Sequence, residues 1–347
     1  MKAYGSPPTL SDVARKAGVG ITTVSRVVNG GDQVSPQTLQ RVKKVIQQMG
    51  FIPNQAARVL KGERTKIIGI LIPSIADPFF STCAEAAQQI ARANDSLLIV
   101  AGTNNDPRLE MESIRLLLRH SADGLLLVPA NDQNSELAAF LNSMSAAAVA
   151  FDRPVFSSRI GSVVTDNLEA AYRATQHLIQ HGHQRILCLC GESQLYTLRE
   201  RISGYRKAME EARLPSLVDM NVKDYRSAEY AIESHLSSDF PPDAILTLKN
   251  STTIYAFETL QKLEVPIPQK IALMGFDDFE LAGTLRPSIS VVQQPAEDLG
   301  RVAAELLFEQ ILNRHKTKRV STPKRGSQIK LESRLVLRAS CGCKVAS

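Results

Sequence analysis

Cysteine and histidine are the residues of this sequence whose chemistry could build a metal or redox site. Two Cys-x-Cys pairs occur, Cys188-Leu-Cys190 in an apolar run and Cys341-Gly-Cys343 in the last ten residues, and Cys83 stands alone. Structural zinc sites usually place roughly two to four residues between paired cysteines and add further ligands. We therefore expect no metal site. An odd number of cysteines without a secretory signal favours reduced thiols.

The sequence lacks the short motifs that build common catalytic sites. We find no phosphate-binding loop, no G-x-S-x-G elbow and no H-E-x-x-H pair. The six histidines are scattered, except that His177, His181 and His183 cluster at the end of a predicted helix, a position typical of the protein surface. We therefore expect neither an enzyme nor a cofactor.

The net charge of +6 is distributed unevenly along the chain. Residues 1–66 contain eleven Lys or Arg and three acidic residues, a net of +8, and residues 314–347 contain ten and one, a net of +9. The stretch between them carries a net of −11. A basic module on an acidic body indicates a polyanionic partner for that module alone. We interpret the basic C-terminal stretch as a solvated loop and tail.

Three short helices must position the basic residues of the first module. Thr9 to Asp12 has the form of a capping box, and the apolar spacing predicts a helix over Leu10–Ala17. A second helix is predicted over Ile21–Asn29. A third begins with Ser35 as N-cap and Pro36 at the first helical position and runs to about Met49.

The residue types and spacing in the first two predicted helices fit a helix-turn-helix. Ala14 is small where the second helix crosses, Gly18 supplies the turn, and Val24 packs back on the first helix. After this all-α headpiece, residues 1–52, Pro53 blocks continuation of the third helix. Asn54 can cap a short helix that Gly62 ends, and so few residues cannot stay helical alone in water. We expect residues 53–65 to form a hinge helix and linker.

From Lys66 the pattern becomes an alternation of short apolar runs and amphipathic helices. Buried apolar strands separated by helices predict parallel sheets covered on both faces. The number of strands predicts an α/β core, residues 66–347, of two doubly wound subdomains with a break near Asp152 to Asp166. The strands are expected at Ile67–Ile72, Leu97–Ala101, Gly124–Val128, Ala147–Phe151, Ile186–Cys190, Ala244–Leu248 and Ile271–Gly275. The helices are expected at Phe79–Ala93, Leu109–His120, Leu168–Gln180, Arg199–Ala212, Thr252–Leu263 and Glu297–Leu312.

Nothing in the sequence points to a membrane or to export. No stretch approaches the ~20 consecutive apolar residues of a spanning helix, and Met1 to Thr9 lack the apolar region of a secretory signal. We expect a cytoplasmic protein. A periplasmic-type binding protein would need an export signal and would lack the basic headpiece, so that class is disfavoured.

Longer strings of residues resemble the lac repressor/galactose repressor family of bacterial transcription regulators over about residues 9–338. In the headpiece these are Asp12-Val-Ala-Arg-Lys-Ala-Gly-Val19, Thr23-Val-Ser-Arg-Val-Val-Asn29, and Pro53-Asn54-Gln-Ala-Ala-Arg-Val-Leu60. In the core they include Asp77-Pro-Phe-Phe80, Phe151-Asp-Arg-Pro154, Gly204-Tyr205 and Gly275-Phe-Asp-Asp278. The resemblance implies a repressor with a core like the periplasmic binding proteins and an effector bound between two subdomains.

The resemblance also implies which headpiece residues meet double-stranded operator DNA. Ile21 and Thr22 would contact base edges, and Arg26, one turn on, would contact either guanine or a phosphate. The other residues implied at the DNA are Thr23, Ser25, Asn29, Asn54, Ala57 and Leu60. Leu60 would be a wedge in the minor groove, or else packs the hinge on the core. Gly20 departs from the family's usual Ser and so lacks an N-cap hydroxyl.

For the effector site the resemblance implies residues that follow strands or begin helices, the usual ligand edge of open α/β sheets. They are Asp77, Phe79, Phe80, Asp152, Arg201, Asn250 and Asp277. The alternatives are that Phe79 and Phe80 belong to the core and that Asp152 and Arg153 form an internal ion pair. The effector is expected to be a sugar, a sugar acid or a phosphorylated sugar, and Lys249 would suit an acidic one.

The resemblance further implies a homodimer, because each headpiece reads half of a pseudo-palindrome. The chain has no leucine-heptad tail of the kind found in tetrameric members. Most sugar-responsive members lose DNA affinity when the effector binds, so we favour induction, with co-repression as the alternative.

Overall fold

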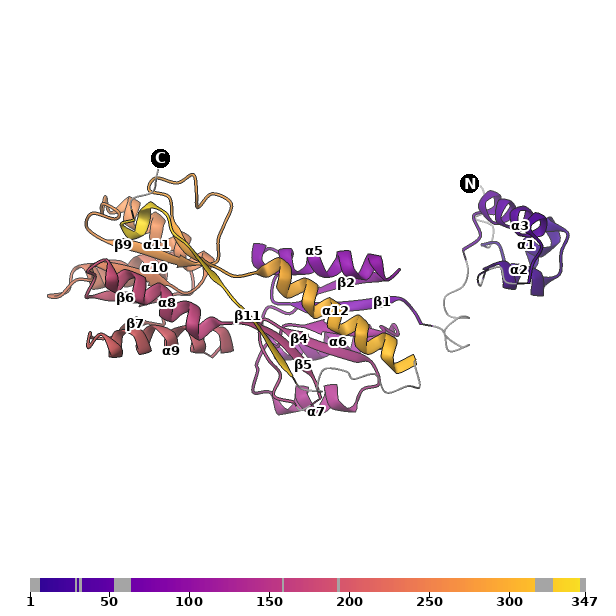
Figure 1. Ribbon diagram of the computed structural model, residues 1–347, viewed down its shortest axis with the longest axis horizontal. Coiled ribbons are helices and arrows are strands. Elements are labelled where there is room, and N and C mark those ends of the chain that lie inside the picture. The colour runs from indigo at the N-terminus through magenta and orange to yellow at the C-terminus, as the bar shows by residue number, and fades with distance from the viewer. Residues whose placement is uncertain are drawn as a thin grey trace. The chain divides into compact units, whose positions relative to one another are not determined.

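The computed structural model describes residues 7–28, 30, 33–52, 64–157, 159–191, 194–315 and 327–343. The chain divides into two compact units, residues 1–65 and 66–347 (Figure 1). Asn29 and residues 53–63 of the expected hinge and linker, with Asn54, Ala57 and Leu60, lie outside the described residues.

The described residues of the first unit form a headpiece of three helices, as the sequence predicts. Its helices are α1 (Leu10–Ala17), α2 (Ile21–Val28) and α3 (Pro36–Met49). The expected signals are confirmed: Thr9 and Asp12 cap α1 reciprocally, Ser35 caps α3, and Gly18 ends α1 in the left-handed conformation with φ 65°. The helices share one small core, made of Val13, Ala14, Ala17, Val24, Val27, Val42, Val45 and Phe51.

The second unit contains two subdomains, each built on a six-stranded sheet of described residues. The sheet of the first subdomain is parallel, in the order β11-β5-β4-β3-β1-β2. Helices α5 and α12 cover one of its faces, and α6 and α7 cover the other. The strands are β1 (Ile67–Ile72), β2 (Leu97–Gly102), β3 (Gly124–Leu127), β4 (Ala147–Phe151), β5 (Gly161–Thr165) and β11 (Gln328–Leu331). The helices are α5 (Pro78–Ala93), α6 (Pro107–Arg119), α7 (Ser135–Ser143) and α12 (Ala296–His315).

The second subdomain repeats this plan in the order β12-β10-β9-β8-β6-β7, with β12 antiparallel to β10. Helices α8 and α9 pack on one face and α10 and α11 on the other. The strands are β6 (Ile186–Leu189), β7 (Leu217–Asp219), β8 (Ala244–Thr247), β9 (Ala272–Phe276), β10 (Ser290–Gln293) and β12 (Arg334–Val336). The helices are α8 (Asn167–Gln180), α9 (Tyr196–Glu211), α10 (Tyr225–Leu236) and α11 (Asn250–Lys262).

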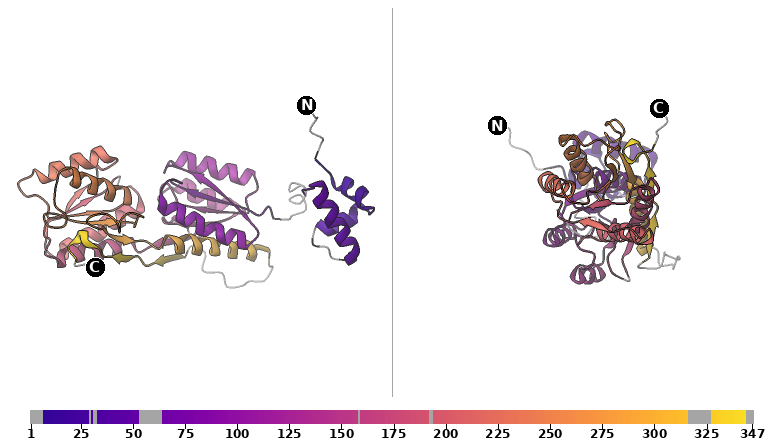
Figure 2. Two further views of the ribbon diagram at one scale, coloured as in Figure 1. Left: turned by 90° about the horizontal axis from the view of Figure 1, so that it is seen from above. Right: turned by 90° about the vertical axis from the view of Figure 1, so that its left-hand side faces the viewer.

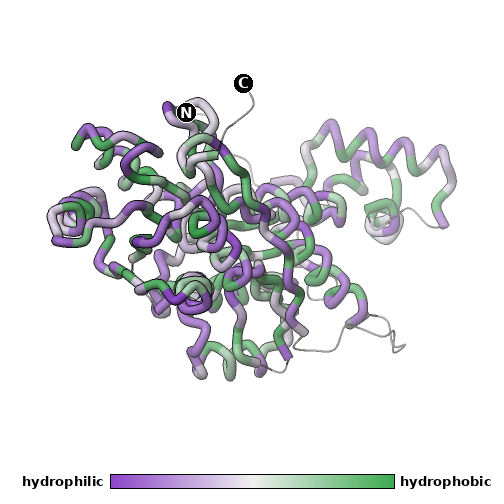
Figure 3. The backbone as a smooth tube through the Cα atoms, turned by 60° about the vertical axis from the view of Figure 1, so that its left-hand side comes forward, coloured by the Kyte–Doolittle hydropathy of each residue, from purple (hydrophilic) through white to green (hydrophobic). Residues whose placement is uncertain are grey.

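The hydropathy of the chain follows from this layering. The central strands are mostly hydrophobic, whereas the surrounding helices alternate between hydrophobic and hydrophilic positions (Figure 3). Strands β1, β3, β4, β6, β8 and β9 are almost wholly buried, as expected for parallel strands covered on both faces. Among the described residues, no helix has the combination of length and hydropathy needed to cross a bilayer.

The chain passes between the two subdomains three times, and this corrects two expectations. The predicted break near Asp152 to Asp166 coincides only with the first passage, from β5 to α8. The chain returns from β10 to α12 and passes a third time from β11 to β12 (Figures 1 and 2). The interpretation of the basic C-terminal stretch as a solvated tail is wrong for residues 327–343. These residues form two strands and the 3₁₀ helix η1 (Ala339–Cys341) because their backbone pairs with β5 and β10.

Candidate functional site

Helix α2 presents one polar face to solvent. Val24 and Val27 are buried in the headpiece core, while Thr22 and Arg26 are exposed and Ile21 is 52% exposed. Among the described residues Arg26 has no ion-pair or hydrogen-bond partner. An exposed large apolar residue beside a hydroxyl and an unpaired guanidinium offers both methyl and hydrogen-bond contacts to the edges of DNA bases. Thr23 and Ser25 lie at the margin of this face and are partly buried.

Gly20 sits immediately before α2 and provides no capping side chain. Its carbonyl oxygen accepts hydrogen bonds from the amides of Thr23 at 3.0 Å and Val24 at 3.2 Å, so the backbone begins the helix in the ordinary way. A Cβ at this position would meet only the Thr22 and Thr23 hydroxyls, at 3.6 and 4.0 Å. Gly20 therefore lacks the hydroxyl of the serine that the family usually has here, and the space around it would accommodate that side chain.

A cavity of about 280 Å³ lies between the two subdomains of the core. It is lined by six of the seven residues expected at the effector site: Asp77, Phe79, Phe80, Asp152, Arg201 and Asp277. Asn250, the seventh, is not among the lining residues; its side chain is buried and accepts a hydrogen bond from the amide of Ser251 at 2.6 Å. Lys249 does line the cavity.

Two of the lining aspartates hold equivalent places in the two subdomains. Asp152 directly follows β4 and Asp277 directly follows β9, and both adopt the left-handed conformation, with φ of 63° and 66°. The Asp152 amide donates to the carbonyl of Val163 at 2.9 Å, and the Asp277 amide donates to that of Val292 at 2.8 Å. Asp tolerates this conformation better than most residues, and such strain often marks functional sites. The backbone thus fixes one carboxylate at the C-terminal end of β4 and the other at the C-terminal end of β9.

Burial dominates the titration of these two carboxyl groups. It raises the pKa of Asp152 to about 6, against the opposing attraction of Arg153 and Arg201. It also raises the pKa of Asp277, although Arg201 and the hydrogen bond from Gln294 at 2.5 Å favour the ionised form. The cleft therefore holds two carboxylates whose ionised form is destabilised by burial when no ligand is bound. Such perturbed groups are common in binding sites.

Arg201 is the best-anchored residue of the cleft. Its Nε donates to Asn167 Oδ1 at 2.7 Å, its Nη1 donates to the Leu248 carbonyl at 2.7 Å, and the guanidinium lies 3.8 Å from the centre of the Phe276 ring. Gly204, one turn further along α9, allows α8 and α9 to approach so closely, because a Cβ there would lie 2.1 Å from the carbonyl oxygen of α8's Leu168. The packing of these two helices is what brings Arg201 to Asn167.

Both alternatives, an internal ion pair between Asp152 and Arg153 and a core position for Phe79 and Phe80, are partly correct. Asp152 and Arg153 do form an internal ion pair, with Oδ2 and Nε 3.3 Å apart, although both residues also line the cavity. Arg153 is held further by Asn105 at 2.6 Å. Phe80 belongs to the core of the first subdomain, whereas Phe79 is only partly buried, and the two rings meet edge to face at 5.0 Å. Phe79 is therefore the aromatic face more accessible to a ligand.

Sequence reasoning missed the contacts that join the subdomains around the cleft. Arg199 on α9 makes a bidentate ion pair with Asp132 of the first subdomain, with N–O distances of 2.7 and 3.2 Å. Gln294 accepts from the Thr165 hydroxyl at 2.7 Å while it donates to Asp277. No local sequence pattern marks these residues, because each pair joins segments far apart in the chain.

A helix-turn-helix headpiece joined to a two-subdomain core with a polar cleft defines the class of effector-controlled DNA-binding regulators. Residues 9–54 match the family described as bacterial regulatory proteins, lacI family. Residues 65–332 match the periplasmic binding proteins and sugar binding domain of the LacI family. This chain belongs to the LacI family: it is a DNA-binding transcription regulator and not an enzyme.

Named relatives and solved structures agree with this assignment. The chain is 30% identical to the ribose operon repressor of Haemophilus influenzae, over 88% of this chain and 92% of the relative. It is 29% identical to the HTH-type transcriptional repressor PurR of Aliivibrio salmonicida, over 90% and 95%. The structure of a transcriptional regulator CelR–cellobiose complex is similar, at 28% identity and a TM-score of 0.70, over 96% of this chain and 99% of that one. The lac repressor dimer bound to operator and the anti-inducer ONPF, at 22% identity, shares the fold with a TM-score of 0.85, over 97% and 99%.

Proposed function

We propose that the headpiece reads an operator half-site through the exposed face of α2. Ile21 and Thr22 contact base edges, Arg26 donates to a guanine, and Thr23 and Ser25 hold phosphates. The observation that supports this is the Arg26 guanidinium, exposed and without a partner among the described residues, one turn beyond Ile21 and Thr22. The proposed DNA contacts also include Asn29, Asn54, Ala57 and Leu60. It also makes the regulator a cytoplasmic homodimer on a pseudo-palindrome.

We further propose that the cleft binds a small sugar-like effector. Vicinal hydroxyls need paired acceptors and donors, which Asp152, Asp277 and Arg201 supply on one cavity, and the partly buried Phe79 supplies an apolar face for a ring. A cavity of about 280 Å³ is slightly smaller than most ligand pockets, which measure about 300–1,000 Å³, and suits a single ring. Lys249 at its edge favours a sugar acid or a phosphorylated sugar as the second candidate.

The effector acts in this proposal by changing the balance between two arrangements of the subdomains. A ligand shifts such a balance only through different affinity for the two states. The cavity is lined from both subdomains, so bound ligand favours one arrangement over the other. We favour loss of operator affinity on effector binding, by a typical coupling of about 1–3 kcal/mol.

Operator reading is tested with full-length protein and duplexes that it selects from a random pool. Arg26→Ala should relax the preference at one base pair per half-site by about 1–3 kcal/mol, measured against every single-base variant. Lys43→Ala is the matched control, because this exposed cation lies on α3. A uniform loss across all variants would make Arg26 a phosphate contact.

The cleft is tested by calorimetry with sugars, sugar acids and phosphorylated sugars. Asp277→Asn keeps the shape and the left-handed backbone of the residue but removes its charge. We expect this variant to lose effector affinity by tenfold or more, about 1.4 kcal/mol, and to bind operator normally without effector. Asp239→Asn, on an exposed site, is the control. Unchanged effector affinity in the Asp277→Asn variant would exclude the cleft as the effector-binding site.

A further inference from the structure

The last described residues of the chain are docked firmly on the second subdomain. Arg338 makes a bidentate ion pair with Asp278, with N–O distances of 2.7 and 2.9 Å. The Ser340 hydroxyl donates to the Leu273 carbonyl at 2.6 Å. These contacts hold η1 against β9 and β10, and they bring the Cys341-Gly-Cys343 segment to the C-terminal end of α8, more than 160 residues earlier in the chain.

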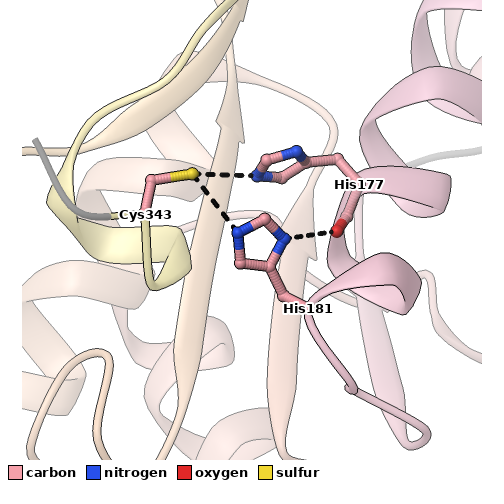
Figure 4. Close-up of side chains that lie close together, drawn as sticks. All are labelled: His177, His181 and Cys343. Carbon is pink, nitrogen blue, oxygen red and sulfur yellow. Dashed lines mark hydrogen bonds between the residues drawn. The ribbon is translucent and has the colours of Figure 1, made fainter.

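Two histidines and two cysteines meet at this place. His177 lies in the last turn of α8 and His181 is its C-cap residue, so the two rings face the same side one turn apart. The Cys343 sulfur lies 3.4 Å from the Nε2 atoms of both His177 and His181 (Figure 4). The Cys341 sulfur lies 3.3 Å from the same nitrogen of His177.

The backbone already fixes the ring of His181 in the form that binds metals. Its Nδ1 lies 2.9 Å from the carbonyl oxygen of His177. A carbonyl oxygen can only accept, so Nδ1 carries the proton and the Nε2 of the neutral ring keeps its lone pair toward Cys343. Metal-ligating histidines usually have their second nitrogen oriented by such a bond.

The distances match three ligands of a tetrahedral ion, two nitrogens and one sulfur, with the Cys341 sulfur adjacent and now accepting a hydrogen bond from the Ser290 hydroxyl at 3.1 Å. Zinc bonds of about 2.0–2.1 Å to nitrogen and 2.3 Å to sulfur place neighbouring nitrogen and sulfur atoms about 3.6 Å apart at tetrahedral angles. The ligand atoms of His177, His181 and Cys343 all lie within 4.8 Å of one another. His181 is exposed and Cys343 is partly exposed, so an ion can reach them from solvent.

We propose that His177, His181 and Cys343, with Cys341 as fourth ligand, bind one Zn²⁺-class transition-metal ion. A donor set of two imidazoles and two thiolates selects zinc over the oxygen-seeking Mg²⁺ and Ca²⁺. The ion ties the end of the chain to α8, the helix whose first residue, Asn167, holds Arg201 at the cleft. This site replaces the expectation that the sequence holds no metal.

The test is a titration of the reduced, chelator-treated, full-length protein with Co²⁺, followed by displacement with Zn²⁺. We expect one Co²⁺ per chain, with the visible bands of a tetrahedral site and a thiolate charge-transfer band, and a Zn²⁺-dependent rise in the thermal midpoint. Cys343→Ser and His181→Ala should each weaken binding by more than about tenfold and lose the rise. His120→Ala, an exposed histidine elsewhere, is the control.

Two results would overturn the proposal. One is a wild-type protein that shows no thiolate band with Co²⁺. The other is a folded His181→Ala variant that keeps the wild-type spectrum and affinity. His181 is exposed, so this variant remains informative even if Cys343→Ser does not fold. Neither measurement involves DNA or the effector, so the result is independent of the proposed regulatory function.

Discussion

At neutral pH the ionised carboxyl group of Asp152 should lower the free energy of unfolding of the effector-free protein. The Asp152→Asn variant should therefore be more stable than wild type. The residue is 3% exposed, and burial raises the pKa of its carboxyl group from the usual 3.8 to about 6. Asn has the same shape, is tolerated at the left-handed φ of 63°, and resembles the protonated acid. The substitution therefore removes the charge together with the ion pair to Arg153, whose attraction is already included in the raised pKa.

The magnitude follows from the difference between the two pKa values. Between about pH 4 and 6 the folded protein retains a proton that the unfolded chain has released, so this group lowers stability as pH rises through that window. The full difference, at 1.36 kcal/mol for each pH unit, is about 3 kcal/mol. Asp152→Asn should therefore be more stable than wild type by about 1 kcal/mol near pH 4.5 and by about 3 kcal/mol near pH 8.

Urea unfolding of the full-length protein across this pH range measures the difference. Asp106→Asn is the matched control, because hydrogen bonds from Arg108 lower the pKa of Asp106 and its pH dependence has the opposite sign. We also expect Asp152→Asn to bind the effector more weakly, since it loses a charged acceptor. A difference between wild type and Asp152→Asn that does not change between pH 4.5 and 8 would refute the reasoning.

Three further outcomes follow from particular contacts. Gly20→Ser should stabilise the headpiece by only a few tenths of a kcal/mol, measured by thermal unfolding, and a loss of stability would contradict the absence of any contact closer than 3.6 Å to a Cβ there. Arg199→Ala should destabilise the core by about 2 kcal/mol in urea because it leaves the buried Asp132 unpaired, and adding Asp132→Ala should recover part of that loss. Gly204→Ala should cost about 1–3 kcal/mol and weaken effector binding, whereas Gly102→Ala, with nothing within 4 Å, should be close to neutral in the same assays.

The sequence predicts those parts of the fold that are defined by local signals. The helices α1 and α3 begin and end as expected, because Thr9, Gly18 and Ser35 act on their own neighbours. The seven strands expected from the sequence are found to within one residue at each end, because a short apolar run between two helices is best buried as a strand. Strands β5, β7, β10 and β12 and helices α7 and α10 were not predicted.

The parts that could not be predicted depend on pairing between distant segments. Strand β11 is short and polar, and it is a strand because Gln328 to Leu331 pair with residues 162–165 of β5. The same holds for the sites. Motifs lead to Asp152 and Asp277, but not to Asn167 or Gln294, which hold their surroundings in place. The spacing of His177 and His181 suits a metal, yet the cysteines that join them lie at the far end of the chain.

The three passages between the subdomains also govern how the protein can be made on a ribosome. The sheet of the first subdomain begins at Ile67, but its face is covered by α12 and its edge is completed by β11, which ends at Leu331. From the end of β5 to that point synthesis takes on the order of ten to thirty seconds at about 5–20 residues per second. During this interval the face that α5 shares with α12 is only partly covered, while the headpiece, whose contacts are all local, can already be folded. The first subdomain can therefore be completed only after β11 has left the ribosome.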